Sequence, residues 1–155
     1  MRLKWILSWS LLLLIVMASS CKSPEESTAQ TKAAIQFELK DTPTMRRYAG
    51  GGTLHIENTA IVSCSNEVGG TITSLNVTWF VGNSQVASTK HDGGRVSGYG
   101  SLEIVFDSEC SAIYKPDTVT FRIVGTDGNG YAIDKSLSYS YNWDDANAGF
   151  MIGRQ

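Results

Sequence analysis

Histidine, proline and charge are scarce in this chain of 155 residues. It has two histidines and three prolines, and charged residues make up 18% of it, below the roughly 25% of an average globular protein. The formal net charge of −2 argues against a basic nucleic-acid-binding face. Hydrophobic residues reach 42%, and all fifteen glycines follow residue 49. This composition excludes a disordered chain, and the length suits one domain with one core.

The scarcity of histidine also limits the chemistry that the chain can perform. His55 and His91 stand far apart, and no HxxxH or CxxC motif accompanies them, so we predict no metal site. No GxSxG motif is present, and the acidic pair Asp144–Asp145 lies in a polar C-terminal segment without a visible partner. We therefore expect no enzymatic activity and no cofactor.

The N-terminus has the pattern of an export signal. Arg2 and Lys4 precede an apolar stretch, and the small residues 18–20 follow it. The stretch is shorter than the ~20 residues of a permanent membrane helix, so we predict that residues 1–20 are a cleaved signal peptide.

The residue after the small triplet is Cys21. The run Ala18-Ser19-Ser20-Cys21 resembles the lipobox of bacterial lipoproteins, although the third residue before the cysteine is more often leucine than alanine. The resemblance implies a diacylglycerol on Cys21 and cleavage before it. It also implies a lipid anchor in the cell envelope, and Lys22 favours the outer membrane. An ordinary signal peptide followed by an unmodified cysteine is the alternative. Residues 21–32 would then be the lipidated cysteine and a flexible tether, since they lack large apolar residues.

From residue 33 the dominant hydrophobic period is two, which predicts half-buried strands. Glycine-rich or Asn-Gly turns separate the runs, and no window shows a helical stripe. Six to eight short strands in residues 33–142 predict an all-β, two-sheet sandwich of about seven strands, followed by a polar tail at 143–155. The alternating runs are 35–39, 53–57, 75–81, 101–106, 118–123 and 137–141.

The sharpest local feature spans residues 119–134, where an alternating strand meets Asp127-Gly128-Asn129-Gly130 and a second strand returns. This segment resembles the last hairpin of bacterial immunoglobulin-like and fibronectin-III-like domains, which implies a sandwich of that type. The same four residues could belong to a calcium loop, but no glutamate stands at the twelfth position, so we interpret them as a tight hairpin turn.

Three cysteines are an odd number for an exported protein. With Cys21 lipidated, Cys64 and Cys110 remain as a pair, and an oxidising compartment favours a disulfide between them. Two full strand crossings between them would return the chain to the same end of the sandwich, whereas three would place the cysteines at opposite ends. We therefore predict that residues 84–90 form a short edge piece without a full crossing.

The segment 91–100, HDGGRVSGYG, is glycine-rich and includes His91, Arg95 and Tyr99. We predict that it is a long loop and the best candidate contact surface. The expected function is a membrane-anchored, non-enzymatic binding or assembly module with a protein partner in the envelope. The alternative is an inhibitor lipoprotein that blocks a lysozyme or a protease.

Overall fold

The computed structural model describes residues 30–47, 52–143 and 150–155, and these residues form an all-β structure. The predicted signal peptide at 1–20 and the lipidation site Cys21 lie outside the described residues. Within the described ranges no helix is long and apolar enough to cross a membrane. The elements are β1 (Ile35–Leu39), β2 (Thr44–Arg47), β3 (Thr53–Cys64), β4 (Gly70–Val81), β5 (Ser84–Val96), β6 (Ser101–Ser111), the 3₁₀ turn η1 (Ala112–Tyr114), β7 (Thr118–Asp127), β8 (Ala132–Ser140) and β9 (Phe150–Ile152).

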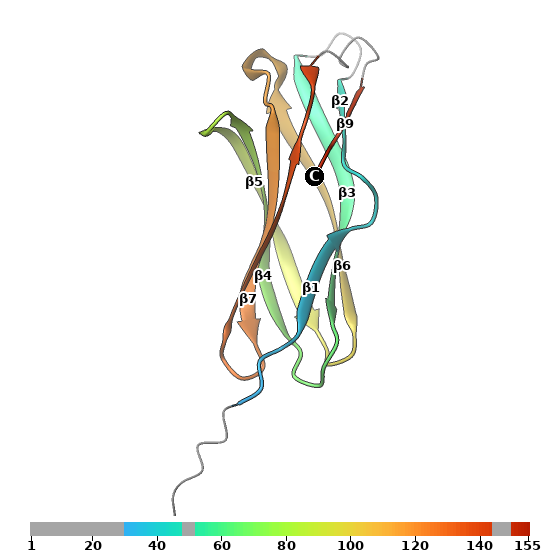
Figure 1. The fold of residues 1–155 in the computed structure, drawn as a ribbon, viewed down its shortest axis with the longest axis vertical. Helices are drawn as coiled ribbons and strands as arrows, with labels where there is room; N and C mark the ends of the chain where they lie inside the picture. Colours follow the sequence, from blue (N-terminus) through green and yellow to red (C-terminus); the bar gives the residue numbers. More distant parts are fainter. Residues whose placement is uncertain (1–29, 48–51, 144–149) are drawn as a thin grey trace, which may run out of the picture. The chain divides into compact units, whose positions relative to one another are not determined.

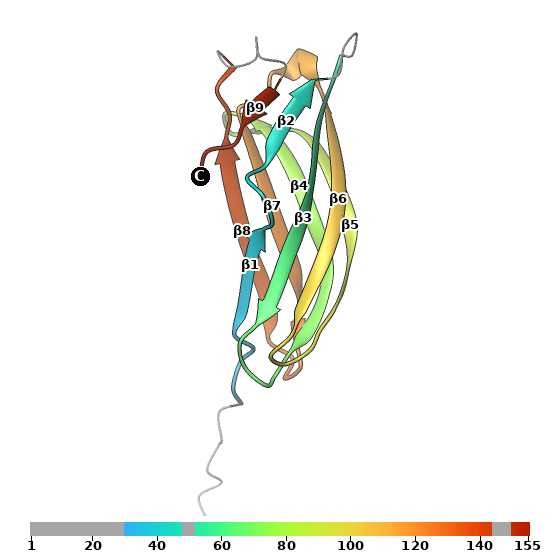
Figure 2. The ribbon, with the colours of Figure 1, turned by 90° about the vertical axis from the view of Figure 1, so that its right-hand side faces the viewer.

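The strands form two antiparallel sheets, one of five strands and one of four. In the five-stranded sheet, β3 pairs with β6 on one side and with β1 and then β2 on the other, while β9 pairs with β2 (Figure 1). The four-stranded sheet has the order β5-β4-β7-β8, and Figure 2 shows it behind β3 and β6. The predicted all-β, two-sheet architecture is confirmed.

The alternation of side chains explains why these segments become strands that share one core. In β6, the buried residues Ile104, Phe106, Ser108 and Cys110 alternate with exposed ones throughout. Because successive side chains of a strand point to opposite faces, this sequence can bury one face only when it is extended. Trp79 of β4 and Phe121 of β7 are the largest fully buried side chains between the sheets.

A short polar network links the two sheets through the core. The indole Nε1 of Trp79 donates to Ser108 Oγ at 2.8 Å, and the Ser108 and Thr89 hydroxyls lie 3.0 Å apart. The network thus joins β4 and β5 of one sheet to β6 of the other. It satisfies the buried Trp79 donor, which would be costly to leave without a partner.

The predicted disulfide between Cys64 and Cys110 is wrong, because both cysteines are free and buried. Residues 84–96 form the full strand β5 instead of a short edge piece, so the chain crosses the sandwich three times between the cysteines. Cys110 lies opposite Leu54, ten residues along β3 from Cys64. At about 3.4 Å per residue this separates them by about 34 Å, against a bridging limit of ~7 Å between Cα atoms.

Both thiols are therefore expected to be available once the protein is unfolded. Alkylation of the non-reduced, denatured protein should modify Cys64 and Cys110 completely by mass spectrometry. A reductant should leave the unfolding midpoint unchanged. In the folded protein Cys110 should react slowly, because burial raises the pKa of its thiol and lowers the reactive thiolate fraction. A peptide in which Cys64 is joined to Cys110 would contradict the three-crossing topology.

The C-terminal residues belong to the domain and do not form the predicted polar tail. Met151 of β9 is buried, and β9 extends the five-stranded sheet beyond β2. Beyond β9, Arg154 pairs with Ser140 at the end of β8, in the other sheet. The last residues therefore link the two sheets along one side. Of the predicted tail, residues 144–149 lie outside the described residues.

The β7–β8 hairpin is confirmed, and its turn also holds the N-terminal end of the domain. The Asp127 carboxylate accepts hydrogen bonds from the backbone N–H groups of Ala33, Asn129 and Tyr131. Desolvation of this carboxylate by itself raises its pKa. The three donors and the nearby Lys32 outweigh this effect, so the pKa of Asp127 is lowered. Asn129 also donates to the carbonyl of Thr31. The end of the predicted tether, at residues 31–32, is thus bound to the domain.

Candidate functional site

Three side chains that can bind a cation meet on the outer face of the five-stranded sheet. His55 is on β3, and Asp107 and Glu109 are two residues apart on β6. The β3–β6 register places His55 directly opposite Glu109 and Glu57 directly opposite Asp107. Because Leu54, Ile56, Ser108 and Cys110 point into the core, the residues between them must point outward.

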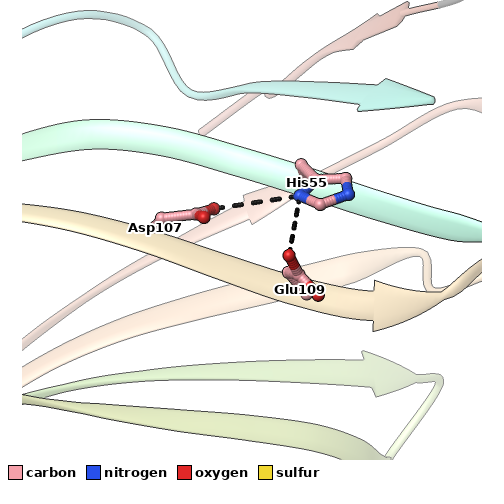
Figure 3. Close-up of side chains that lie close together, drawn as sticks. All are labelled: His55, Asp107 and Glu109. Carbon is pink, nitrogen blue, oxygen red and sulfur yellow. Dashed lines mark ion pairs between the residues drawn. The ribbon is translucent and has the colours of Figure 1, made fainter. Parts of the chain in front are cut away.

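The three groups approach closely enough to interact (Figure 3). His55 Nδ1 lies 3.2 Å from Glu109 Oε1 and 4.0 Å from Asp107 Oδ1. The potential ligand atoms of all three residues lie within 4.8 Å of one another. The imidazole is mostly covered, with 19% of its side chain exposed, whereas the two carboxylates are 54% and 58% exposed. The cluster is therefore a partly covered imidazole with two carboxylates open to solvent.

The surface around this cluster is predominantly acidic. Glutamates at positions 38, 57 and 103 also lie on the outward positions of β1, β3 and β6, and the cations on this face are Lys40 and Arg46. We call this surface the acidic face, defined by Glu38, Glu57, Glu103, Asp107 and Glu109. Glu57 opposes Asp107 directly across the ladder, and like charges in that position repel.

A hollow of about 220 Å³ borders His55 on the side of β2. It is lined by Asp41, Thr42, Thr44, Arg46, His55, Glu57 and Asn58. The cluster is therefore flanked by a mixed-charge depression, in which Arg46 is directly opposite His55 in the β2–β3 register.

The outer face of the four-stranded sheet has a different character. Hydroxyl groups pair across its strands, as between Thr120 and Ser138 at 2.9 Å. The guanidinium of Arg122 on β7 forms two hydrogen bonds with the Asp134 carboxylate on β8. This pairing lowers the pKa of Asp134 and raises that of Arg122. The two outer faces thus differ in charge, one acidic and one hydroxyl-rich with an internally neutralised ion pair.

The predicted contact loop at 91–100 is wrong as a loop, because residues 91–96 are the end of β5 and only 97–100 make the turn. His91 is half buried, with its ring centroid 5.8 Å from that of Phe106 and its Nε2 buried without a hydrogen-bond partner. Arg95 is exposed, and Tyr99 is 75% exposed in the turn. Binding through His91, Arg95 and Tyr99 stays a prediction, although the Nε2 atom of His91 is buried.

The reason for this arrangement is a bulge in β4. The register between β4 and β7 shifts between Ile72 and Ser74, and this extra residue reverses the side-chain alternation along β4 and along β5, which pairs with it. His91 pairs with the buried Leu75 on one side of the bulge, and Arg95 pairs with the exposed Thr71 on the other. His91 consequently faces inward and Arg95 outward, although their spacing in the sequence predicts a common face.

Sequence reasoning did not find the contact of His55 with Asp107 and Glu109. The alternation in 53–57 places His55 on the face opposite to Leu54 and Ile56, and the alternation in 101–106 can be extended to Asp107 and Glu109. The β3–β6 register was the missing information, because 52 positions separate His55 from Asp107 in the sequence.

Comparisons with known proteins place the chain in no family: no protein-family model and no curated protein matches it. Some solved structures resemble the chain at low similarity. A protein from Archaeoglobus fulgidus is 11% identical with a TM-score of 0.41, over 68% of this chain and 98% of that one. The putative ApaA protein from Bordetella pertussis is also 11% identical, with a TM-score of 0.46, over 70% of this chain and 94% of that one.

A larger protein shows a weaker likeness. Catalytically inactive OgpA from Akkermansia muciniphila, solved in complex with an O-glycopeptide substrate, is 13% identical with a TM-score of 0.35. The match covers 79% of this chain and 32% of that one. None of these similarities transfers a function to this chain.

Proposed function

We propose that this chain is a lipid-anchored protein of the bacterial cell envelope whose immunoglobulin-like domain is a non-enzymatic binding module. The strand order supports the finer fold assignment. Strands β1, β3 and β6 oppose β5, β4, β7 and β8, and the chain changes sheets after β3, β5, β6 and β8. A sandwich of two antiparallel sheets with such connections is the pattern of immunoglobulin-like and fibronectin-III-like domains.

The observation on which the binding role rests is the difference between the two outer faces. The acidic face concentrates five carboxylates on one sheet, whereas the outer face of the opposite sheet carries both signs: Lys90 and Arg95 are exposed there, and Arg122 pairs with Asp134. A concentrated charge of one sign attracts a partner of the opposite sign and determines its orientation on docking. The partner we infer is a protein of the envelope that presents a basic surface, and it docks on the acidic face.

Lipidation of Cys21 would hold this module at the membrane. Each buried CH₂ of an acyl chain contributes about 0.8 kcal/mol, so the two or three chains of a lipoprotein anchor it stably, unlike one chain alone. Replacement of Cys21 by serine removes the acylation site, and we expect the variant to move from the membrane pellet to the soluble fraction of lysed cells. A variant that stays in the pellet after a carbonate wash would contradict the anchor.

The partner is best sought by crosslinking the tagged protein in its native envelope and identifying the captured proteins by mass spectrometry. Capture alone does not test the docking face, so the experiment compares two charge reversals. Glu103→Lys changes the acidic face, and Glu67→Lys makes the same change of charge in the exposed turn after β3. We expect the first variant to lose most of the captured partner and the second to retain it.

The role of charge has a second measurement. Recovery of the partner should fall as the salt concentration of the wash increases, since exposed charge pairs are screened within about 8 Å at physiological ionic strength. A partner captured equally by wild type and Glu103→Lys would overturn docking on the acidic face.

A further inference from the structure

We propose that His55, Asp107 and Glu109 form a binding site for a divalent transition-metal ion, of which Zn²⁺ is the best candidate. This inference goes beyond the proposed docking role and depends on neither the lipid anchor nor the partner. It requires three particular side chains in a defined geometry, whereas docking requires only the charge of the face.

The spacing of the three residues suits a single ion. Two carboxylates at positions i and i+2 of β6 point to the same face, and the imidazole faces them from the adjacent strand. Zinc bonds of about 2.0–2.2 Å in tetrahedral geometry separate neighbouring ligand atoms by about 3.4 Å. The imidazole nitrogen lies 3.2 Å from Glu109 Oε1 and 4.0 Å from Asp107 Oδ1, so small carboxylate rotations suffice.

The backbone that holds the ligands is rigid. β3 is the central strand here, hydrogen-bonded to β6 on one side and to β2 beside His55 on the other. On each strand the neighbours of the ligands are buried in the core, as Leu54 and Ile56 are beside His55. A site on such strands is preorganised, so binding costs little conformational entropy beyond that of the two carboxylate side chains.

The surrounding charge favours a cation at this point. Glu57 directly opposes Asp107, and this like-charge pair borders the imidazole on the same face. Arg46, opposite His55 on β2, acts against a bound cation, but the carboxylates of the acidic face outnumber the cations near it. A divalent ion would relieve the repulsion between the carboxylates.

The ligand types select the class of metal. Ca²⁺ and Mg²⁺ prefer oxygen ligands alone, whereas an imidazole nitrogen favours Zn²⁺, Cu²⁺ or Ni²⁺. Three protein ligands would leave a fourth position of a tetrahedral ion for water or for another molecule. A nonspecific ion atmosphere on the acidic face would show no such preference, and this difference can be tested.

The test is calorimetric titration of the intact protein, purified in detergent and treated with a chelator, with Zn²⁺ and separately with Ca²⁺. We expect one Zn²⁺ per chain, an affinity at least about 10-fold lower in His55→Gln and in Glu109→Gln, and no displacement by millimolar Ca²⁺. Glu103→Gln is the matched control, because it removes a charge from the same strand and face but outside the cluster, and it should bind Zn²⁺ like wild type.

Two further readings make the result decisive. Circular dichroism of each variant establishes that the sheets are intact, and the ring signals of His55 and His91 in proton–nitrogen spectra report which imidazole binds the metal. Zn²⁺ should shift the signals of His55 alone. Equal Zn²⁺ affinity in wild type and His55→Gln, binding that Ca²⁺ abolishes, or a shift of His91 instead would overturn the proposal.

Discussion

Replacement of Trp79 by alanine is expected to lower the free energy of unfolding by about 3–5 kcal/mol, the largest effect of any single substitution considered for this domain. The side chain is fully buried in β4 and is the largest in the core. Its removal forfeits the apolar contacts between the sheets and leaves a cavity that rigid strands cannot close. Because domains of this size have stabilities of about 5–15 kcal/mol, the variant should be near the limit of folding.

Urea denaturation followed by circular dichroism measures this effect in the wild type and the variant. Two controls separate the apolar contribution from the hydrogen bond that Trp79 donates to Ser108. Trp79→Phe retains much of the buried volume and should cost less than alanine. Ser108→Ala removes the acceptor of the indole N–H and the partner of Thr89 but leaves the indole in place. A loss below about 1 kcal/mol for Trp79→Ala would show that this side chain is not the centre of the core.

Replacement of Gly93 by alanine is expected to cost about 3 kcal/mol, although the added group is only a methyl. A Cβ atom at this position would lie 2.0 Å from the backbone oxygen of Ile72, beside the bulge of β4. Gly125 flanks the same bulge from β7, where a Cβ would lie 2.2 Å from the oxygen of Thr71. The obstacle is backbone in both cases, so a change of rotamer cannot relieve the clash.

The neighbouring residue provides the matched control. A Cβ at Gly94 would lie 3.0 Å from the Cδ1 atom of Leu102, the end of a flexible side chain that can move by a few tenths of an ångström. Gly94→Ala should therefore unfold close to the wild-type urea concentration and Gly93→Ala well below it. If the two variants unfold at the same concentration, the close approach of β5 to β4 at the bulge is not as described.

The close approach of Gly93 to Ile72 also explains why the prediction of a loop at 91–100 is wrong. Glycine clusters usually mark turns, and Asp92-Gly93-Gly94 has the composition of one. Here Gly93 is needed because the strand passes close to a neighbouring backbone, which is the other common reason for glycine in a strand. A single sequence does not separate these two reasons, since the second depends on a bulge in another strand.

The amino-acid sequence was sufficient for the features that depend on near neighbours in the chain. The alternation of apolar and polar residues predicted an all-β chain and two packed sheets, because only an extended strand buries every second residue. The turn at residues 127–130 followed from equally local rules. Strands in which the alternation is weak were not predicted. Examples are β5, which is rich in glycines and polar residues, and the short strand β9.

The tertiary structure alone decided which distant residues meet. It separated Cys64 from Cys110 by a strand crossing that the weak pattern of 84–96 had concealed, and it brought the C-terminal residues into the five-stranded sheet. It also placed His55 beside Asp107 and Glu109. The physical reason is that strand register results from packing of the whole core, because each strand can pair with any other strand. A slip of two residues preserves the alternation along each strand but moves every side chain to a new neighbour, so the local pattern does not determine which residues meet.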